Sequence, residues 1–232
     1  MVIYKHQPPL RLLIANAKGG SGKTTIATNL AAYFAQQGDS IVLYDHDPQG
    51  SSQLWLKQRP DDSPAIRGID ACRPHSVSQT RSWQLRVPDD CRKVIIDSPA
   101  AIKDADLRPL IRQADVILVP VLPSSIDIRA AADFIKTLML TPEHLQRPGR
   151  ICVVANRVRR NTLSQEKLKA FLNCLSIPYL TTLRDTQNYV AASELGLGVH
   201  ELRGRRTQRD RQEWQPLIDW VEQLEQARQQ AG

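Results

Sequence analysis

The stretch Leu10-Arg-Leu-Leu-Ile-Ala-Asn-Ala-Lys-Gly-Gly-Ser-Gly-Lys-Thr-Thr25 decides the fold of this chain. Its first residues, 10–15, form a short apolar run typical of a buried strand, and apolar side chains recur at helical spacing over 26–35. The glycines between them let backbone N–H groups approach an anion unobstructed, and a helix adds partial positive charge at its N-terminus. The stretch therefore predicts a strand, an anion-binding loop and a helix, which together make a P-loop.

The end of this loop has the residues that bind phosphate and metal. Lys23 is placed to reach the β- and γ-phosphates of a nucleotide, and the Thr24 hydroxyl can ligate Mg²⁺. The loop departs from the usual pattern six residues before that lysine, where Ala17 replaces glycine. A second lysine, Lys18, directly precedes Gly-Gly.

The pattern Lys-Gly-Gly-Ser-Gly-Lys-Thr-Thr resembles the deviant Walker A box of the ParA/MinD family of ATPases. The resemblance implies that Lys18 is a signature lysine, which reaches across a dimer interface to the nucleotide of the partner subunit and neutralises charge during catalysis. It also implies that ATP is bound by the whole box: Lys18, Gly19, Gly20, Ser21, Gly22, Lys23, Thr24 and Thr25.

Composition and charge narrow the class of protein. Apolar residues make up 41% of the 232 residues and charged residues 24%, as in soluble globular proteins. No apolar run approaches the roughly 20 residues that span a bilayer, and the N-terminus lacks a secretory signal, so we expect a cytoplasmic protein. Four scattered cysteines favour reduced thiols over a metal site or disulfides. The net charge of +7 is compatible with a polyanionic partner.

Strand and helix patterns alternate along the chain, and the apolar strands are continuous, which indicates a sheet covered by helices on both faces. We predict an α/β fold with a doubly wound, mostly parallel sheet in a single P-loop domain over residues 1–232. Further strands are expected at 40–44, 93–96, 116–121 and 151–155, and helices at 51–57, 105–113, 126–140 and 163–175. A short strand and a helix around 77–85 are expected within 66–92. A final helix from about Pro216, covering about 214–229, should pack its apolar stripe on the domain.

Two acidic boxes follow predicted strands: Asp45-His-Asp-Pro-Gln-Gly50 and Val94-Ile-Ile-Asp-Ser-Pro99. In an open α/β sheet ligands bind at this carboxyl edge, and the alternatives are a polar turn or a helix cap. The boxes resemble the family's switch I box and the Walker B strand that opens switch II. The resemblance implies that Asp47 is catalytic and positions the attacking water. It places Thr24, Asp47 and Asp97 around Mg²⁺.

Asn156 and Arg157 follow the strand expected at 151–155. The Asn156 amide has both a donor and an acceptor, so it can read adenine. The family's motif at this strand end, with Ala155 here in place of threonine, implies that Asn156 and Arg157 contact the nucleotide. Residues 184–196 resemble a later loop and helix through which the family passes its nucleotide state to partners.

The resemblance implies a Mg²⁺-dependent ATPase that switches between a monomer and an ATP-bound homodimer. Such chemistry is phosphoryl transfer to water, promoted by positioning and charge. The compact length resembles the small ParA type, which partitions plasmids or positions protein cargo over the nucleoid with a ParB-like or adaptor protein that stimulates hydrolysis. The cargo remains open among plasmid, carboxysome, chemotaxis cluster and chromosome.

Two other functions remain open. One is a MinD-like ATPase that acts at the membrane, although the tail 219–230 has three acids against one base, a poor match to anionic lipid. We therefore expect no membrane partner. The other is a metabolic P-loop ligase, which would need a small-substrate pocket.

Two stretches are rich in basic residues. Residues 200–211 contain five arginines against two acids, and residues 147–169 contain seven basic residues against one acid. Charge runs are usually solvated faces, but the family's dimers bind DNA without sequence preference through C-terminal basic residues. We therefore predict non-specific DNA binding and nucleoid association through Arg203, Arg205 and Arg206.

Overall fold

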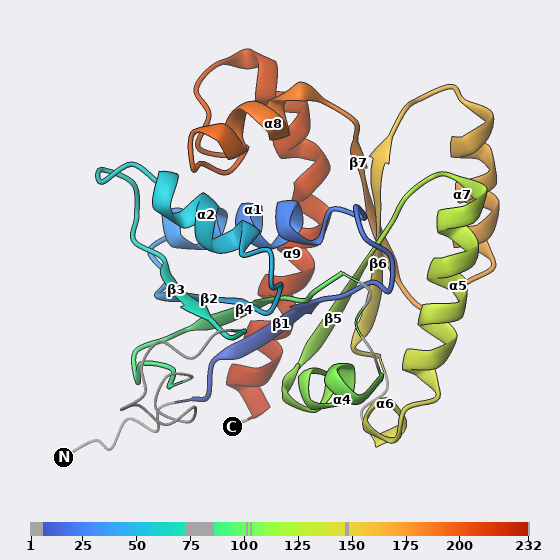
Figure 1. The fold of residues 1–232 in the computed structure, drawn as a ribbon, viewed down its shortest axis with the longest axis horizontal. Helices are drawn as coiled ribbons and strands as arrows, with labels where there is room; N and C mark the ends of the chain where they lie inside the picture. Colours follow the sequence, from blue (N-terminus) through green and yellow to red (C-terminus); the bar gives the residue numbers. More distant parts are fainter. Residues whose placement is uncertain (1–6, 73–85, 101, 103, 147–148, 232) are drawn as a thin grey trace.

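A seven-stranded sheet forms the centre of the computed structural model (Figure 1). The structure describes residues 7–72, 86–100, 102, 104–146 and 149–231. Within them the strand order is β3-β2-β4-β1-β5-β6-β7, and every neighbouring pair is parallel. The strands are β1 (Leu10–Ile14), β2 (Ile41–Asp45), β3 (Arg67–Asp70), β4 (Lys93–Asp97), β5 (Val116–Val121), β6 (Ile151–Val158) and β7 (Tyr179–Arg184).

Helices cover both faces of this sheet, so the predicted doubly wound α/β fold is confirmed. Every residue of β2, β4 and β5 is buried, which explains why these strands read as continuous apolar runs. The helices are α1 (Lys23–Gln36), α2 (Ser51–Gln58), α4 (Asp104–Gln113), α5 (Ser125–Met139), α6 (Pro142–Gln146), α7 (Leu163–Asn173), α8 (Gln187–Glu194) and α9 (Gln208–Ala231).

The two faces of the sheet carry separate apolar cores. On one face, α1, α2 and α9 pack against the sheet through Phe34, Trp55 and Trp214. On the other, α4, α5 and α7 pack through residues that include Leu107 and Phe134. Burial of these large side chains is the main favourable term that holds the layers together.

The position of β1 in the sheet determines where the P-loop lies. β1 pairs with β4 on one side and β5 on the other. The chain moves outward in both directions from this strand, so the helices that follow β1 and β5 lie on opposite faces. A crevice opens at such a point, outside the carboxyl ends of the strands, and the P-loop between β1 and α1 lies there.

The C-terminal part of the chain differs from the sequence-based expectation. α9 begins at Gln208, so a helix start near 214–216 is wrong. Pro216 lies inside α9 on its exposed side, where the loss of one backbone hydrogen bond is tolerated. The extra turns are held by Asp210, which is fully buried and accepts a 2.5 Å hydrogen bond from Arg184 Nε.

Two elements were not predicted from the sequence. One is the edge strand β7, in which only alternate residues are buried, and the other is the short helix α6. The short strand expected within 66–92 is β3. The helix expected around 77–85 lies outside the described residues.

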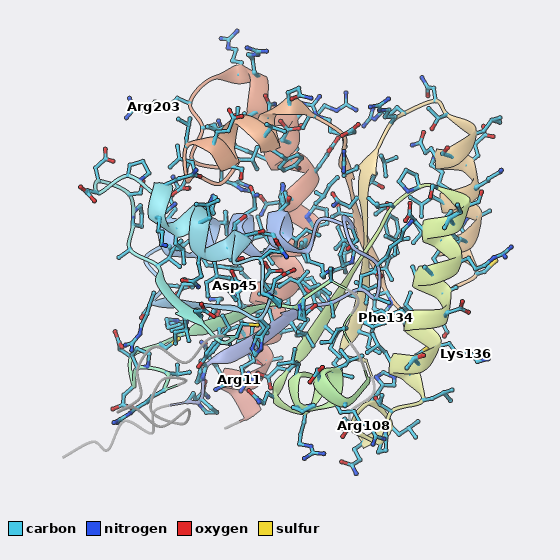
Figure 2. All side chains as sticks on the ribbon, viewed as in Figure 1. Arg11, Asp45, Arg108, Phe134, Lys136 and Arg203 are labelled. Atoms are coloured by element: carbon cyan, nitrogen blue, oxygen red, sulfur yellow. The ribbon has the colours of Figure 1, made fainter. Side chains whose placement is uncertain are left out.

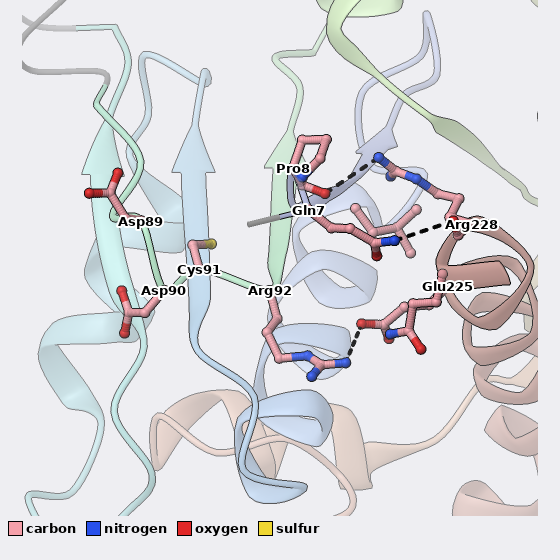
Figure 3. A pocket seen from close by; sticks show the side chains of 10 residues that line it. Gln7, Pro8, Asp89, Asp90, Cys91, Arg92, Glu225 and Arg228 are labelled. Carbon is pink, nitrogen blue, oxygen red and sulfur yellow. Dashed lines mark hydrogen bonds and ion pairs between the residues drawn. The ribbon is translucent and has the colours of Figure 1, made fainter. Parts of the chain in front are cut away.

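The amino edge of the sheet carries a charged network that fastens α9 (Figure 3). Lys93 is buried and lies 2.5 Å from Asp39 Oδ2 and 2.6 Å from Glu225 Oε2. Arg92 donates to Glu225 at 2.7 Å, and Arg228 pairs with Asp115 at 2.7 Å. Arg92, Glu225 and Arg228 also line a cavity of 350 Å³ on the side of the sheet away from the P-loop, so the network ties α9 to the sheet rather than forming the nucleotide site.

None of the helices in the described ranges combines the length and apolar character needed to cross a bilayer.

Candidate functional site

A cavity of 570 Å³ lies over the P-loop at the carboxyl edge of the sheet. Its volume is in the range of pockets that enclose small molecules. Segments far apart in the sequence line it: the P-loop and start of α1, the loop after β2, the loop after β4, the end of β6, and α8. The predicted site residues on its wall are Gly20, Gly22, Lys23, Thr24, Thr25, Asp47, Asn156 and Arg157.

Two asparagines clamp the P-loop. Asn156 Nδ2 donates to the Ser21 carbonyl at 2.8 Å, and a Cβ at Gly22, whose φ is 93°, would lie 2.0 Å from that nitrogen. Asn16 Nδ2 donates to the Pro120 carbonyl at 2.6 Å while its Oδ1 accepts from the Lys18 N–H at 3.0 Å. Only glycine fits at position 22, and the loop is held in shape before any ligand arrives. Asn16 was missed, although a polar residue directly after an apolar strand was a signal for it.

Lys23 is enclosed by the loop that precedes it. Its side chain is buried, and Nζ donates to the Lys18 carbonyl at 3.2 Å. Burial lowers the pKa of Lys23, and the negative charges of Asp97 and Asp47 oppose that shift. A phosphate placed against Nζ would replace lost solvation with a charge-assisted hydrogen bond.

Lys18 lies outside the loop that encloses Lys23. Its side chain is 40% exposed and forms an ion pair with Asp127 in the first turn of α5. The Ser124 side chain caps this helix and bonds to the same aspartate. Lys18 together with Ser124 lowers the pKa of Asp127 despite its partial burial. The two lysines of the box therefore have different environments.

Asp97 is the buried carboxylate beneath the site. It is fully buried at the end of β4, and its Oδ2 accepts a 2.6 Å hydrogen bond from Ser52 Oγ in the first turn of α2. Burial raises the pKa of Asp97 to about 7, opposed by the hydroxyls of Ser52 and Thr24 and by Lys23. Ser52 was not singled out from the sequence, because only the folded chain brings α2 to the end of β4.

The two carboxylates of the first acidic box have different environments. Asp45 is buried and accepts backbone N–H bonds from Asp47 at 2.9 Å and Gln53 at 3.0 Å. Burial is the main cause of its raised pKa. Asp47 lines the cavity, and its Oδ2 accepts from the Ala100 N–H at 3.3 Å. Asp45 therefore shapes the loop, and Asp47 joins it to the segment after β4.

Asn156 and Arg157 both line the cavity, but the Asn156 amide is already engaged. Besides donating to the P-loop, it accepts from the Arg157 N–H at 3.0 Å. Arg157 has φ of 54°, a rare conformation for a residue with a side chain, and its Nε lies 3.6 Å from Asp185. Recognition of adenine by Asn156 stays a prediction.

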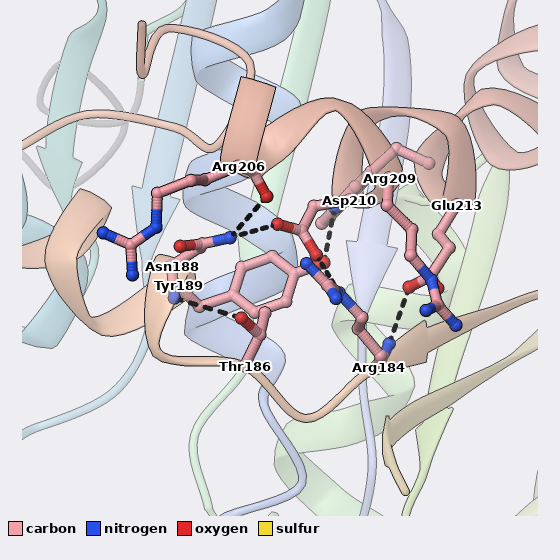
Figure 4. A network of polar contacts seen from close by, with 9 residues as sticks. Arg184, Thr186, Asn188, Tyr189, Arg206, Arg209, Asp210 and Glu213 are labelled. Atoms are coloured by element: carbon pink, nitrogen blue, oxygen red, sulfur yellow. Dashed lines mark hydrogen bonds and ion pairs between the residues drawn. The ribbon is translucent and has the colours of Figure 1, made fainter. Parts of the chain in front are cut away.

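The α8 wall of the cavity is hydrogen-bonded to the start of α9 (Figure 4). Asn188 Nδ2 donates to the Arg206 carbonyl at 3.2 Å and to Asp210 Oδ2 at 2.5 Å. The Trp214 indole donates to the Tyr189 hydroxyl at 2.9 Å. The cavity is therefore connected to the segment that carries the predicted DNA-binding arginines.

The arginines of the two basic stretches divide into exposed and engaged side chains. Arg203, Arg205 and Arg206 are exposed on the connection between α8 and α9, and Figure 2 shows Arg203 projecting away from the body of the protein. Arg150 is instead buried and donates to the carbonyls of Ile111 and Ala114 at 3.0 and 2.8 Å. Arg209 pairs with Glu213. The number of basic residues in the two stretches therefore overstates how many basic side chains are exposed and unpaired.

The residues present fit ATP with Mg²⁺. Ser21 Oγ and Asp97 Oδ1 are buried without a hydrogen-bond partner among the described residues, beside a loop that only glycine can complete. The described residues contain no cluster of three or more His, Cys, Asp or Glu suited to a metal. Mg²⁺ commonly binds through one or two carboxylates together with substrate phosphates and water, and Asp97, which is hydrogen-bonded to the Thr24 side chain, fits that pattern.

Fold and site together define a P-loop nucleotide-binding protein of the α/β class. A family model described as the CobQ/CobB/MinD/ParA nucleotide-binding domain matches residues 12–199. The maintenance of carboxysome distribution protein A of Halothiobacillus neapolitanus is 30% identical over 196 residues, 84% of this chain and 88% of that protein. The chain therefore belongs to the CobQ/CobB/MinD/ParA family, and within it resembles the ParA/MinD ATPases.

Solved structures share the fold at lower identity. A complex of a Cyanothece McdA variant with ATP has a TM-score of 0.64 at 18% identity, covering 83% of this chain and 90% of that one. The MinC:MinD complex of Aquifex aeolicus has a TM-score of 0.67 at 17% identity, covering 93% and 96%. These structures bear on the fold alone; the recognition of the family from its Walker A box is confirmed by the family model and the Halothiobacillus relative.

Proposed function

We propose that this chain is a Mg²⁺-dependent ATPase whose ATP-bound form is a homodimer that binds DNA without sequence preference and positions a cargo over the nucleoid. The observation that carries the proposal is the different placement of the two lysines. Lys23 is buried within its own loop, whereas Lys18 is 40% exposed and reaches out to Asp127. A lysine held outside its own loop in this way could exchange the Asp127 carboxylate for a nucleotide phosphate held by a second copy of the chain.

The chemistry follows from where the charged groups lie. Lys23 and the loop N–H groups would bind the phosphates, and Thr24 with Asp97 would hold Mg²⁺, which when bound neutralises phosphate charge. Asp47, on the cavity wall, would orient the attacking water. Lys18 of the partner subunit would neutralise charge that develops on the transferred phosphoryl group.

DNA binding would use the three exposed arginines after α8. One chain offers few phosphate contacts, and two-fold pairing doubles them, so the dimer would hold DNA at salt concentrations where the monomer releases it. This links DNA binding to ATP. The carboxysome distribution function in the name of the Halothiobacillus relative supports cargo positioning. An adaptor or ParB-like protein would stimulate hydrolysis.

The proposal is tested by measuring mass and DNA binding in three nucleotide states. Light scattering after size exclusion with a non-hydrolysable ATP analogue should give a dimer, and ADP or no nucleotide a monomer. Gel shifts with unrelated DNA duplexes should show binding with the analogue only, weakening steeply as salt is raised. A protein that stays monomeric, or binds DNA equally in all three states, would contradict the proposal. Binding to anionic liposomes with ATP would instead favour a membrane-acting ATPase.

A further inference from the structure

Helix α2 runs from the nucleotide cavity to residues 196–201, which lead into the basic loop, defined here as residues 202–206. Its first turn is bonded to the site: Ser52 Oγ donates to Asp97, and the Gln53 N–H donates to Asp45 at 3.0 Å. Ser51 lines the cavity itself. The start of α2 is therefore fastened to both acidic boxes.

The other end of α2 is fastened to the segment that leads into the basic loop. Arg59, directly after the helix, donates to Glu201 through both terminal nitrogens, at 2.9 and 2.6 Å. The two side chains are 6% and 7% exposed. Arg59 Nη1 also donates to the Gly196 carbonyl at 3.2 Å, and Glu201 accepts from the Gly198 N–H at 2.8 Å. The pair thus joins residues that lie 142 positions apart.

Backbone packing around the pair leaves little freedom. Gly196 has φ of 64°, and a Cβ there would lie 2.3 Å from the Arg59 backbone nitrogen. The Trp55 indole donates to the Leu197 carbonyl at 3.2 Å, and the Arg59 guanidinium lies 5.4 Å from the centre of the Trp55 ring. A shift of α2 would therefore move residues 196–201 with it.

The chemistry of the pair favours a role in positioning over a role in stability. Removing two charges from water is costly, and a buried ion pair adds little stability compared with apolar residues of the same volume. What a bidentate arginine–carboxylate contact supplies is a defined geometry. The basic loop begins one residue after Glu201, so that geometry sets where the loop starts, while Arg211 and Asn188 hold its later carbonyls.

We propose that Arg59 and Glu201 are positioning residues that couple the nucleotide cavity to the basic loop through α2. A nucleotide-dependent change in the loop after β2 moves α2, and the ion pair passes this movement to Arg203, Arg205 and Arg206. The inference rests on the proposed ATP-dependent DNA binding and names the path by which one site controls the other.

The test compares Glu201→Gln and Arg59→Lys with the wild type. Glu143→Gln is the matched control, because Glu143 pairs with Arg112 between α4 and α6, on the other face of the sheet. We expect affinity for fluorescent ATP to be unchanged in all variants. The preference of DNA binding for ATP over ADP should fall by about fivefold or more in the first two variants, the lower bound of typical coupling energies, and be unchanged in the control.

Simple electrostatics predicts a different result for Glu201→Gln. Loss of a negative charge beside the basic loop would tighten DNA binding in every nucleotide state. That outcome, or an unchanged preference for ATP, would overturn the coupling role. If the single variants unfold, the apolar pair Arg59→Met with Glu201→Leu should keep the fold and still lose the preference.

Amide hydrogen exchange keeps this inference separate from the proposed function. Wild-type protein without any preference for ATP would contradict the proposed DNA-binding function. Even if the wild type shows no such preference, exchange of residues 202–206 should still differ between its ATP and ADP states, and Glu201→Gln should abolish that difference. Identical exchange in the two states of the wild type would overturn the coupling.

Discussion

Lys18 and Lys23 lie five positions apart in one loop, yet their side chains have different environments. Lys23 is buried, donates to the Lys18 carbonyl and interacts with the charges of Asp97 and Asp47. Lys18 is bound to Asp127 on another element. The structure therefore predicts different defects when each lysine is removed.

Lys23→Ala should weaken ATP binding about 10- to 100-fold, because a hydrogen bond to a charged group contributes roughly 1.5–3 kcal/mol. Titration with fluorescent ATP measures the change. Lys57→Ala, which removes an exposed lysine of α2, is the control and should bind normally. Near-normal affinity in Lys23→Ala would show that the P-loop assignment is wrong.

Lys18→Ala should keep ATP affinity within about threefold of the wild type, since its side chain lies outside the loop that encloses Lys23, and a threefold change is less than 1 kcal/mol. The ATP-dependent dimer and hydrolysis should be impaired. Size exclusion with a non-hydrolysable analogue and a phosphate-release assay measure both. Lys136→Ala, an exposed lysine on α5, is the control. A variant that dimerises and hydrolyses like the wild type would make Lys18 an ordinary loop lysine.

At the scale of elements, the segment between α8 and α9 is held by packing as much as by hydrogen bonds. His200 lies in this segment with its ring 4.9 Å from that of Tyr33 and 6.1 Å from that of Trp214. Neither ring nitrogen has a hydrogen-bond partner among the described residues. Burial lowers the pKa of His200 from 6.5 to about 4, with a further lowering by Arg211 that Glu201 partly opposes.

This histidine predicts a loss of stability in acid. Between pH 6.5 and 4 the unfolded chain binds a proton at His200 that the folded chain does not, so the free energy of unfolding falls as pH falls. The loss should be at most about 3 kcal/mol. Urea denaturation at a series of pH values measures it, with His200→Phe as the comparison, since phenylalanine preserves the ring contacts. Equal pH dependence in the two proteins would contradict the prediction.

At the scale of the whole molecule, the nucleotide cavity and the charged network of Lys93 lie at opposite edges of the sheet. The cavity lies at the carboxyl edge, and α8 and the start of α9 connect it to the exposed arginines after α8. The charged network of Lys93 lies at the opposite, amino edge. Partner-dependent functions are therefore expected at the carboxyl edge.

Changing Arg203, Arg205 and Arg206 together to alanine should weaken ATP-dependent DNA binding and leave ATP affinity unchanged, because none of them lines the cavity. The slope of log affinity against log salt should become shallower by about 0.9 for each DNA phosphate that the variant no longer neutralises. Fluorescence anisotropy with DNA at several salt concentrations measures both effects. The matched control changes three exposed basic residues on α4 and α5, namely Arg108, Arg129 and Lys136. An equal effect of the two triple variants would remove the assignment to this cluster.

The sequence alone determined the P-loop, the parallel sheet and the main acidic positions. These features depend on short-range patterns: apolar runs for buried strands, glycines next to lysine for phosphate, and carboxylates at strand ends. Asp97 ends β4 and Asp47 lies two residues beyond β2, as expected, whereas Asn156 lies within β6, which continues to Val158 instead of ending at Ala155. The start of α9 was predicted too far along the chain, because Pro216 is typical of a helix start. The helix in fact begins at Gln208, where Asp210 is buried and bonded to Arg184.

Only the tertiary structure decided which charges are available and which are engaged. Arg150 and Arg203 look alike in sequence, yet one is buried against backbone carbonyls and the other is exposed. Likewise, the sequence does not indicate that Ser52 bonds to Asp97 or that Arg59 bonds to Glu201. The physical reason is that burial and pairing depend on which elements the strand order places side by side, and those partners are too far apart in the chain for any local pattern to relate them.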